Sequence, residues 1–265
     1  MDATLTILGS GTLLPNEDRH SAAHLVEVGS ARILMDCGSG TLHGFSRHGV
    51  QWDRLTHVVV THYHSDHIGD LYALLFALKY GLRTPREEPL TLVGPVGFGD
   101  FLDRLLQVRG PEVLDTSFPA TVVELAEGDV LRDDRSGFSL TCHSTPHTPE
   151  SVAYRLDLGA AVVGYTGDTG PSEGVAEFLK GCDVLVSECA LTDPPEWDLH
   201  LSPVGVADIA SVAKPGLLVL THVYPPLEPE DAADQVTAAG YGGRVLAATD
   251  GLRLPLGGGV GDHVI

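Results

Sequence analysis

Apolar and polar residues alternate along the chain in short blocks, and these blocks predict strands and helices that follow one another from end to end. Aliphatic and β-branched runs bounded by glycine, proline or charged residues are typical of strands. The predicted strands are Thr4–Leu8, His24–Val28, Arg32–Met35, Thr56–Val60, Leu90–Val93, Val122–Leu125, Phe138–Cys142, Val152–Leu156, Ala161–Tyr165, Val184–Ser187, Leu217–Leu220 and Arg244–Ala247. The segment at 244–247 is expected to be the last strand.

Longer amphipathic blocks predict helices between these strands. Ser202 is a good N-cap, and Pro203 at the first helical position opens a helix that runs to Ala213. The other predicted helices are Thr41–His48, Leu71–Tyr80, Phe98–Gln107, Glu173–Lys180 and Glu228–Ala239. Short turns at Gly29–Ser30 and 157–160 indicate hairpins, so the sheets are expected to mix parallel and antiparallel strands. We predict two stacked sheets with outer helices in one α/β (α+β) domain, residues 1–265.

Composition narrows the classes of function. The 265 residues carry 36 acidic and 16 basic side chains, a formal net charge of −20, which makes nucleic acid an unlikely partner because phosphates are repelled. The four cysteines include no CxxC pair, and neither a signal peptide nor an apolar run of transmembrane length is visible. We therefore expect a cytoplasmic protein without a membrane partner.

Residues of metal-ligand type cluster directly after the strand at 56–60. The stretch Thr61-His62-Tyr63-His64-Ser65-Asp66-His67 places three imidazoles and one carboxylate within six positions of a strand-to-helix connection. Open α/β sheets place their ligands at such carboxyl ends. Imidazole and carboxylate suit Zn, Fe, Mn or Ni, and four such groups exceed what one tetrahedral ion draws from so short a loop. The spacing therefore predicts two divalent ions side by side.

Three later residues repeat the pattern of a strand that ends in a residue of metal-ligand type. His147 follows the strand at 138–142 after a short loop, Asp168 follows the strand at 161–165, and His222 follows the strand at 217–220. Taken singly, each has an ordinary explanation as a surface histidine or a turn former. Together with the cluster, they supply seven possible ligands from four strand ends, which is the number that a dinuclear site needs.

These motifs resemble the ordered metal motifs of the metallo-β-lactamase superfamily from Leu5 to about Gly251. The resemblance implies a four-layer αββα sandwich. It also implies that one ion binds His62, His64 and His147, that the other binds Asp66, His67 and His222, and that Asp168 bridges them. Asp36 then fixes the tautomer of one imidazole. Two ions, about 3.5–4 Å apart, hold a hydroxide that attacks an electrophilic centre, and Asp66 orients it.

Two further stretches are similar to ribonuclease Z and its relatives. These are Leu8-Gly9-Ser10-Gly11-Thr12 and the run from His147 to Arg155. In such enzymes a histidine at the place of His200 donates a proton to the leaving oxygen, which makes His200 a candidate general acid. The alternative is a solvated loop histidine beside Asp198. The family also suggests a homodimer.

The chain departs from ribonuclease Z where substrate is bound. The tight turn at 157–160 leaves no room for the family's tRNA-gripping arm, and Glu17 and Asp18 stand in a loop where the family carries a basic motif. We therefore expect a hydrolase of small ester substrates, first of all small phosphodiesters such as cyclic nucleotides, with zinc or else manganese or iron. The alternatives are a ribonuclease Z-type tRNA 3′-processing endonuclease, an arylsulfatase or lactonase, and a metal-binding module without activity.

Overall fold

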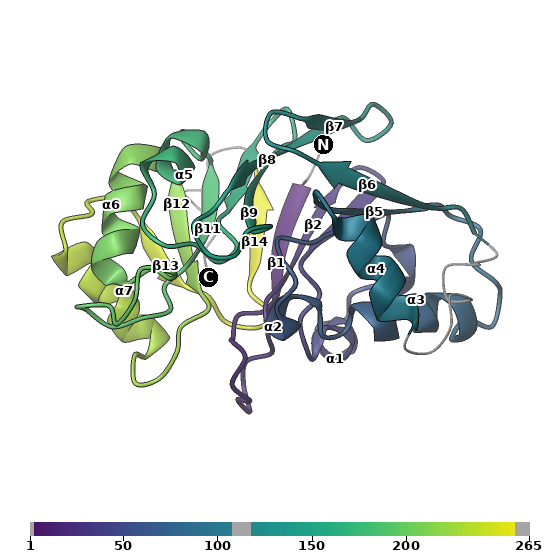
Figure 1. The fold of residues 1–265 in the computed structure, drawn as a ribbon, viewed down its shortest axis with the longest axis horizontal. Coiled ribbons are helices and arrows are strands. Elements are labelled where there is room, and N and C mark those ends of the chain that lie inside the picture. The colour runs from purple at the N-terminus through teal and green to yellow at the C-terminus, as the bar shows by residue number, and fades with distance from the viewer. Residues whose placement is uncertain (1–2, 108–117, 258–265) are drawn as a thin grey trace.

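The computed structural model describes residues 3–107 and 118–257, which form two β-sheets and the helices that cover them (Figure 1). The ends of the predicted domain, residues 1–2 and 258–265, and the segment 108–117 lie outside the described residues.

The strands of the first sheet stand in the order β14-β1-β2-β3-β4-β5-β6, and those of the second in the order β13-β12-β11-β10-β9-β8-β7. The first sheet contains β1 (Ala3–Gly9), β2 (Ala23–Val28), β3 (Ala31–Met35), β4 (His57–Val59), β5 (Leu90–Pro95), β6 (Ala120–Leu125) and β14 (Arg253–Leu256). The second sheet contains β7 (Val130–Asp133), β8 (Phe138–Ser144), β9 (Val152–Asp157), β10 (Val162–Tyr165), β11 (Val184–Glu188), β12 (Leu217–Thr221) and β13 (Val245–Ala247).

Helices cover the outer face of each sheet. The first sheet carries α1 (Thr41–Arg47), the short helices η1 (Trp52–Arg54) and α2 (Ser65–Ile68), α3 (Leu71–Tyr80) and α4 (Phe98–Gln107). The second carries α5 (Glu173–Phe178), α6 (Pro203–Ala213) and α7 (Pro229–Ala238). Figure 1 shows the two helical layers on opposite sides of the paired sheets, so the four-layer αββα arrangement is confirmed.

Three hydrophobic cores hold these layers together. The central core lies between the sheets and includes Leu5, Leu140 and Tyr154, each fully buried. A second core packs α1, α3 and α4 against the first sheet, and a third packs α5, α6 and α7 against the second. Because β12 is buried on both faces, its first four residues, Leu217–Leu220, are a continuous apolar run rather than an alternating pattern.

Parallel pairing gathers the ends of many strands at one edge of the sandwich. Strands β3 to β6 are parallel to one another, and so are β10 to β13. Strand β8 runs in the same direction as β10, because β9 is antiparallel to both. The residues that follow β3, β4, β8, β10, β11 and β12 therefore emerge at one rim, which is where the sequence placed its candidate ligands.

Most of the predicted elements are confirmed within one to three residues, including the hairpins that join β2 to β3 and β9 to β10. The expectation that the strand near 244–247 is the last was wrong, because β14 follows it and pairs with β1. Strand β7 and the one-turn helix α2, which takes in part of the histidine cluster, were also not predicted. None of the helices in the described part of the chain combines the length and apolar character needed to span a bilayer.

The contribution of the Ser202 N-cap to stability can be tested by substitution. The Ser202 side chain accepts a hydrogen bond from the Gly205 amide at 3.4 Å, and Ser202 is buried. Pro203 follows it in the first turn of α6. We expect Ser202→Ala to lower the free energy of unfolding by about 1 kcal/mol. Ser202→Thr should retain most of the capping contribution, because threonine also has a side-chain oxygen that accepts from the helix amides. Urea unfolding at one fixed metal concentration measures the effect.

The matched control is Ser46→Ala, because Ser46 lies exposed in the last turn of α1 and caps nothing. A loss in Ser46→Ala as large as that in Ser202→Ala would contradict the capping role.

Candidate metal centre

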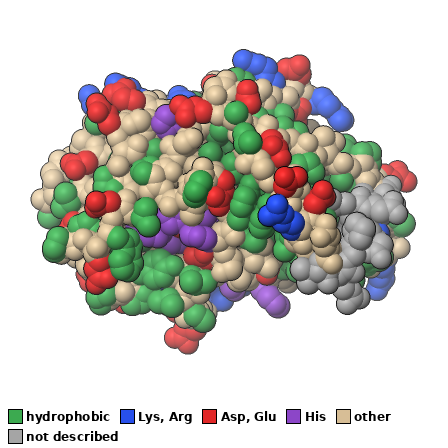
Figure 2. All heavy atoms as spheres, viewed as in Figure 1, with side chains coloured by type: hydrophobic (Ala, Val, Ile, Leu, Met, Phe, Trp, Pro, Cys, Tyr) green, Lys and Arg blue, Asp and Glu red, His purple; other side chains and the backbone are tan. Residues whose placement is uncertain are grey.

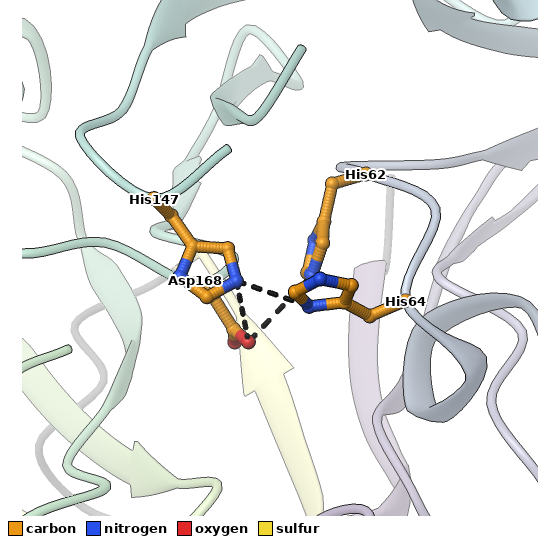
Figure 3. Close-up of side chains that lie close together, drawn as sticks. All are labelled: His62, His64, His147 and Asp168. Atoms are coloured by element: carbon orange, nitrogen blue, oxygen red, sulfur yellow. Dashed lines mark hydrogen bonds and ion pairs between the residues drawn. The ribbon is translucent and has the colours of Figure 1, made fainter. Parts of the chain in front are cut away.

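The rim of the sandwich brings the predicted ligands of both sheets face to face. His62 and His64 follow β4, and Asp66 and His67 lie in α2, on the side of the first sheet. Residues 147, 168 and 222 follow β8, β10 and β12 of the second. Figure 3 shows His62 and His64 pointing from one half of the molecule toward His147 and Asp168 from the other.

Asp168 stands at the centre of this arrangement. Its Oδ2 lies 3.6 Å from the Nε2 atoms of both His62 and His147. Its Oδ1 lies 3.2 Å from Nε2 of His67 and 3.6 Å from Nε2 of His222. The two oxygens of one carboxylate therefore face two different pairs of imidazoles.

The outer members complete each group. His64 contributes Nδ1, which lies 3.1 Å from Nε2 of His147, and Asp66 Oδ2 lies 3.2 Å from Nε2 of His222. One ligand-type atom from each of His62, His64, His147 and Asp168 lies within 4.8 Å of the others, and the same holds for Asp66, His67 and His222. Ligand atoms that share a tetrahedral zinc ion with bonds of about 2.0–2.1 Å lie roughly 3.4 Å apart, so both groups have the dimensions of an ion site.

Several polar atoms at the centre have no hydrogen-bond partner. Nε2 of His62, Nε2 of His67 and Oδ1 of Asp168 are buried and unpartnered within the described chain. The opposite nitrogens are occupied: Nδ1 of His67 donates to Asp36 at 2.7 Å, and Nδ1 of His147 donates to the Leu199 carbonyl at 2.9 Å. With Nδ1 as the donor, Nε2 of His67 and of His147 is the nitrogen directed at the centre, and in a neutral ring of this tautomer it is the nitrogen that can bind a metal.

The residue that orients His67 is itself held by several donors. Asp36 follows β3 with a positive φ of 58° and is fully buried. Its carboxylate accepts hydrogen bonds from the amide and hydroxyl of Thr61 and, at 2.8 Å, from the Tyr165 hydroxyl. Asp36 therefore lies behind the His67 imidazole and accepts its Nδ1–H.

The electrostatics of the centre favour positive charge. Burial lowers the pKa values of His62 and His147, so both rings are neutral and able to ligate. Burial also acts to lower the pKa of His67, but Asp168 and Asp36 raise it well above its ordinary value. Burial acts to raise the pKa of Asp168, yet His222 and His67 hold it well below its ordinary value. The carboxylates of Asp168 and Asp36 thus favour positive charge at the His67 ring, which a bound cation would supply in place of a proton.

A second polar unit adjoins the centre. Nδ1 of His200 donates to the buried carboxylate of Glu188 at 3.0 Å, and the His200 ring packs against those of His147 and His222 with centroids 4.6 and 5.8 Å away. Burial acts to lower the pKa of His200, but the hydrogen bond and the charge of Glu188 raise it. His200 is therefore not the solvated loop histidine of the alternative interpretation.

Glu188 was missed by the sequence analysis. It ends β11 and is 1% exposed, and it also accepts from the amides of Thr169 at 2.6 Å and Leu201 at 3.2 Å. Burial raises its own pKa. The available signal was the one that also marked His222, a polar residue directly after a predicted buried strand. Glu188 belongs to no motif of spaced ligand-type residues, so this signal alone did not single it out.

All nine residues singled out in the sequence lie at this rim, and the donor set fits divalent metal ions. Imidazoles and carboxylates whose ligand atoms lie within 4.8 Å of one another, several of them without a hydrogen-bond partner in the described chain, are what Zn²⁺ and similar ions require.

Comparisons with known proteins agree with this geometry. A family model described as "Beta-lactamase superfamily domain" matches residues 31–223. Ribonuclease Z of Mycolicibacterium gilvum is 30% identical over 266 residues, covering 92% of this chain and 90% of that protein.

Solved structures share the fold. The metallo-β-lactamase fold protein YhfI from Bacillus subtilis superposes with a TM-score of 0.82 at 23% identity, covering 96% of this chain and 100% of that one. The short form of human tRNase Z superposes with a TM-score of 0.75 at 22% identity, covering 95% and 98%. The chain therefore belongs to the beta-lactamase superfamily, and it is a metal-dependent hydrolase with the metallo-β-lactamase fold and a sequence similar to ribonuclease Z.

Proposed function

We propose that this hydrolase is a dinuclear phosphodiesterase that acts on small phosphodiesters such as cyclic nucleotides. The observation that carries the proposal is the position of Asp168, whose two oxygens face two separate groups of imidazoles beside the His200–Glu188 pair. In this assignment His62, His64 and His147 hold one ion, while Asp66, His67 and His222 hold the other. Asp168 contacts both.

Bound metal ions would supply the Lewis acid that the side chains do not provide. Two divalent ions at this centre lower the pKa of a water molecule toward 7 and neutralise charge on phosphoryl oxygens. Zinc suits the imidazole-rich donor set, and manganese or iron is also compatible with it.

The side chains of the chain have three roles in this proposal. Asp36 holds the His67 ring by accepting its Nδ1–H. Hydrogen bonding to His222 keeps the pKa of Asp66 low against the effect of burial, so its carboxylate is ionised and can accept a proton from the attacking water. His200 donates a proton to the oxygen that leaves when the P–O bond breaks, and Glu188 stabilises the protonated ring.

The surroundings of the site favour a small diester over a long RNA. The turn at 158–161 joins β9 to β10 directly, with Val162 paired to Asp157, so no arm projects there. The net charge of −20 opposes a polyanion, since many phosphates would lie outside the reach of two ions. A small diester brings a single negative charge to the centre.

A ribonuclease Z activity is the second candidate, and the 30% identity to a protein of that name favours it. The two candidates predict different behaviour on a precursor tRNA.

Metal content tests the centre itself. We expect two equivalents of zinc or manganese per chain after loading and dialysis, and fewer than two in Asp168→Ala, because both groups lose a shared oxygen. Chelation is expected to abolish turnover of bis(p-nitrophenyl) phosphate, and added metal to restore it.

Elemental analysis gives the stoichiometry, and a circular dichroism spectrum confirms that the variant is folded. His43→Ala, which removes an exposed histidine of α1, serves as the matched control and should keep two equivalents. An Asp168→Ala protein that also keeps both ions would contradict the shared-carboxylate assignment.

The role of His200 is tested by the quality of the leaving group. We expect His200→Ala to lower kcat for 2′,3′-cyclic AMP by about 10²–10⁴-fold, because a ribose oxygen needs a proton as it leaves. The loss for bis(p-nitrophenyl) phosphate should be below about tenfold, since p-nitrophenolate leaves unprotonated.

Glu188→Gln should also lower kcat more for 2′,3′-cyclic AMP than for bis(p-nitrophenyl) phosphate, but by a smaller factor than His200→Ala. This variant keeps the His200 ring and removes only the carboxylate charge that stabilises its protonated form. Equal losses on both substrates would rule out proton donation by His200.

The second candidate is tested with a precursor tRNA that carries a 3′ extension. We expect kcat/KM on this RNA to be at least about 100-fold below that on 2′,3′-cyclic AMP, because no arm grips the RNA and the surface repels it. Cleavage directly after the discriminator nucleotide at a higher kcat/KM than for the cyclic nucleotide would replace the small-substrate proposal with the ribonuclease one.

A further inference from the structure

A cavity of about 400 Å³ opens beside the metal centre on the side of His200. Its walls come from the connection between β11 and α6 and from the segment that follows β12. The residues that matter here are Glu196, Trp197, His200, Tyr224, Pro225 and Pro226. The volume is within the range of about 300–1,000 Å³ that is typical of small-molecule sites.

The cavity is continuous with the proposed reaction centre. His200 belongs to its wall and also contacts the rings of His147 and His222. The Tyr224 ring stands edge-on to His222 with centroids 5.3 Å apart. Because His200 is the proposed proton donor, a molecule in this cavity lies on the side of the leaving oxygen.

The walls present flat, apolar surfaces. The Trp197 side chain is 52% exposed although it is large and hydrophobic, and the rings of Tyr224, Pro225 and Pro226 line the same cavity. Figure 2 shows hydrophobic side chains next to a group of histidines near the middle of one face. An exposed indole beside a catalytic centre is a stacking surface for an aromatic ring.

The charge in the cavity excludes a second anion. Among the described residues that line it, none is lysine or arginine, and Glu196 contributes a carboxylate. Asp193 and Asp198 belong to the same connection and are exposed. Away from His200, which the proposed mechanism assigns to the leaving oxygen, a phosphate or carboxylate on the leaving group would meet only acidic side chains, whereas N–H groups of a neutral ring find an acceptor in Glu196.

We infer that this cavity receives the leaving group and selects one that carries a flat, uncharged aromatic ring, as the nucleoside of a 2′,3′-cyclic nucleotide does. The inference rests on the proposed phosphodiesterase function. Water adds to phosphorus and gives a proton to Asp66, one of the two P–O bonds to the ribose breaks, and the ribose oxygen so released takes a proton from His200. The other P–O bond remains, so the product is a nucleoside monophosphate. The base remains stacked on Trp197.

Binding of the nucleoside is tested first, without turnover. Trp52 and Trp197 are the two tryptophans of the chain, so Trp52→Phe leaves Trp197 as the sole indole reporter. Adenosine should quench its fluorescence in a saturable manner, and ribose should not. Absence of quenching by adenosine would overturn the inference.

Turnover then tests selection between two matched diesters. 2′,3′-Cyclic AMP and glycerol 1,2-cyclic phosphate share the five-membered ring phosphate, but only the first has a base. We expect Trp197→Ala to lower kcat/KM for the nucleotide by about tenfold and to leave the glycerol compound within about twofold.

Val204→Ala is the control, because Val204 is 47% exposed in the first turn of α6 and lies outside the cavity wall. Equal effects of Trp197→Ala on both diesters would overturn the inference.

Charge selection is tested with the 5′-phosphorylated form of 2′,3′-cyclic AMP. The wild-type protein should prefer the unphosphorylated nucleotide by about fivefold or more at low salt, and Glu196→Gln should reduce that preference. A preference that Glu196→Gln leaves unchanged would overturn the role of Glu196.

These results separate the two proposals. Hydrolysis of both diesters without any dependence on Trp197 overturns the cavity inference alone. A protein that hydrolyses neither diester, nor bis(p-nitrophenyl) phosphate, overturns the phosphodiesterase function. Saturable quenching of Trp197 by adenosine in that same protein still supports an aromatic binding cavity.

Discussion

Asp36 accepts hydrogen bonds from two parts of the chain about a hundred residues apart, the connection after β4 and the end of β10, and this buried carboxylate joins the two halves of the sandwich at the site. Thr61 follows β4, His67 lies in α2, and Tyr165 ends β10 in the opposite sheet. A fully buried carboxylate is stable only when donors replace the water it has lost. The donors that stabilise Asp36 therefore also set the ring of His67 and the approach of the second sheet. Asp36 also has a left-handed backbone, with a φ of 58°, which few residues other than glycine adopt.

The sequence was informative wherever the physical signal is local. The run before His62 predicts a buried strand because β-branched residues follow one another, and Ser202 with Pro203 predicts a helix start. The candidate ligands were identifiable because their residue types recur at strand ends. Strand β14 was not, since Pro255 argues against a strand and only pairing with β1, from the other end of the chain, makes it one. Glu188 was missed for a similar reason: its partners become neighbours only after folding.

The distribution of the ligands couples metal binding to folding. Each half of the molecule supplies part of each group, because Asp168 and His222 come from the second sheet and His67 comes from the first. Neither half alone presents a complete site, and the unfolded chain presents none. Ions that bind only the folded sandwich stabilise it by mass action. Buried polar atoms without a hydrogen-bond partner, such as Nε2 of His62, lower the stability of a fold unless a ligand satisfies them, and a bound ion would do so here.

The acidic surface and an anionic substrate are compatible because the two act over different distances. Exposed charges are screened within about 8–10 Å in physiological salt, whereas ions bound at a buried centre dominate the field where they sit. A substrate with a single negative charge, located at the ions, gains that local attraction. A longer anionic substrate would also approach carboxylates of the rim within that screening distance, beginning with Glu196 in the adjoining cavity. Under the proposed function, the same charge distribution that opposes a long polyanion is compatible with a compact diester whose leaving group is neutral.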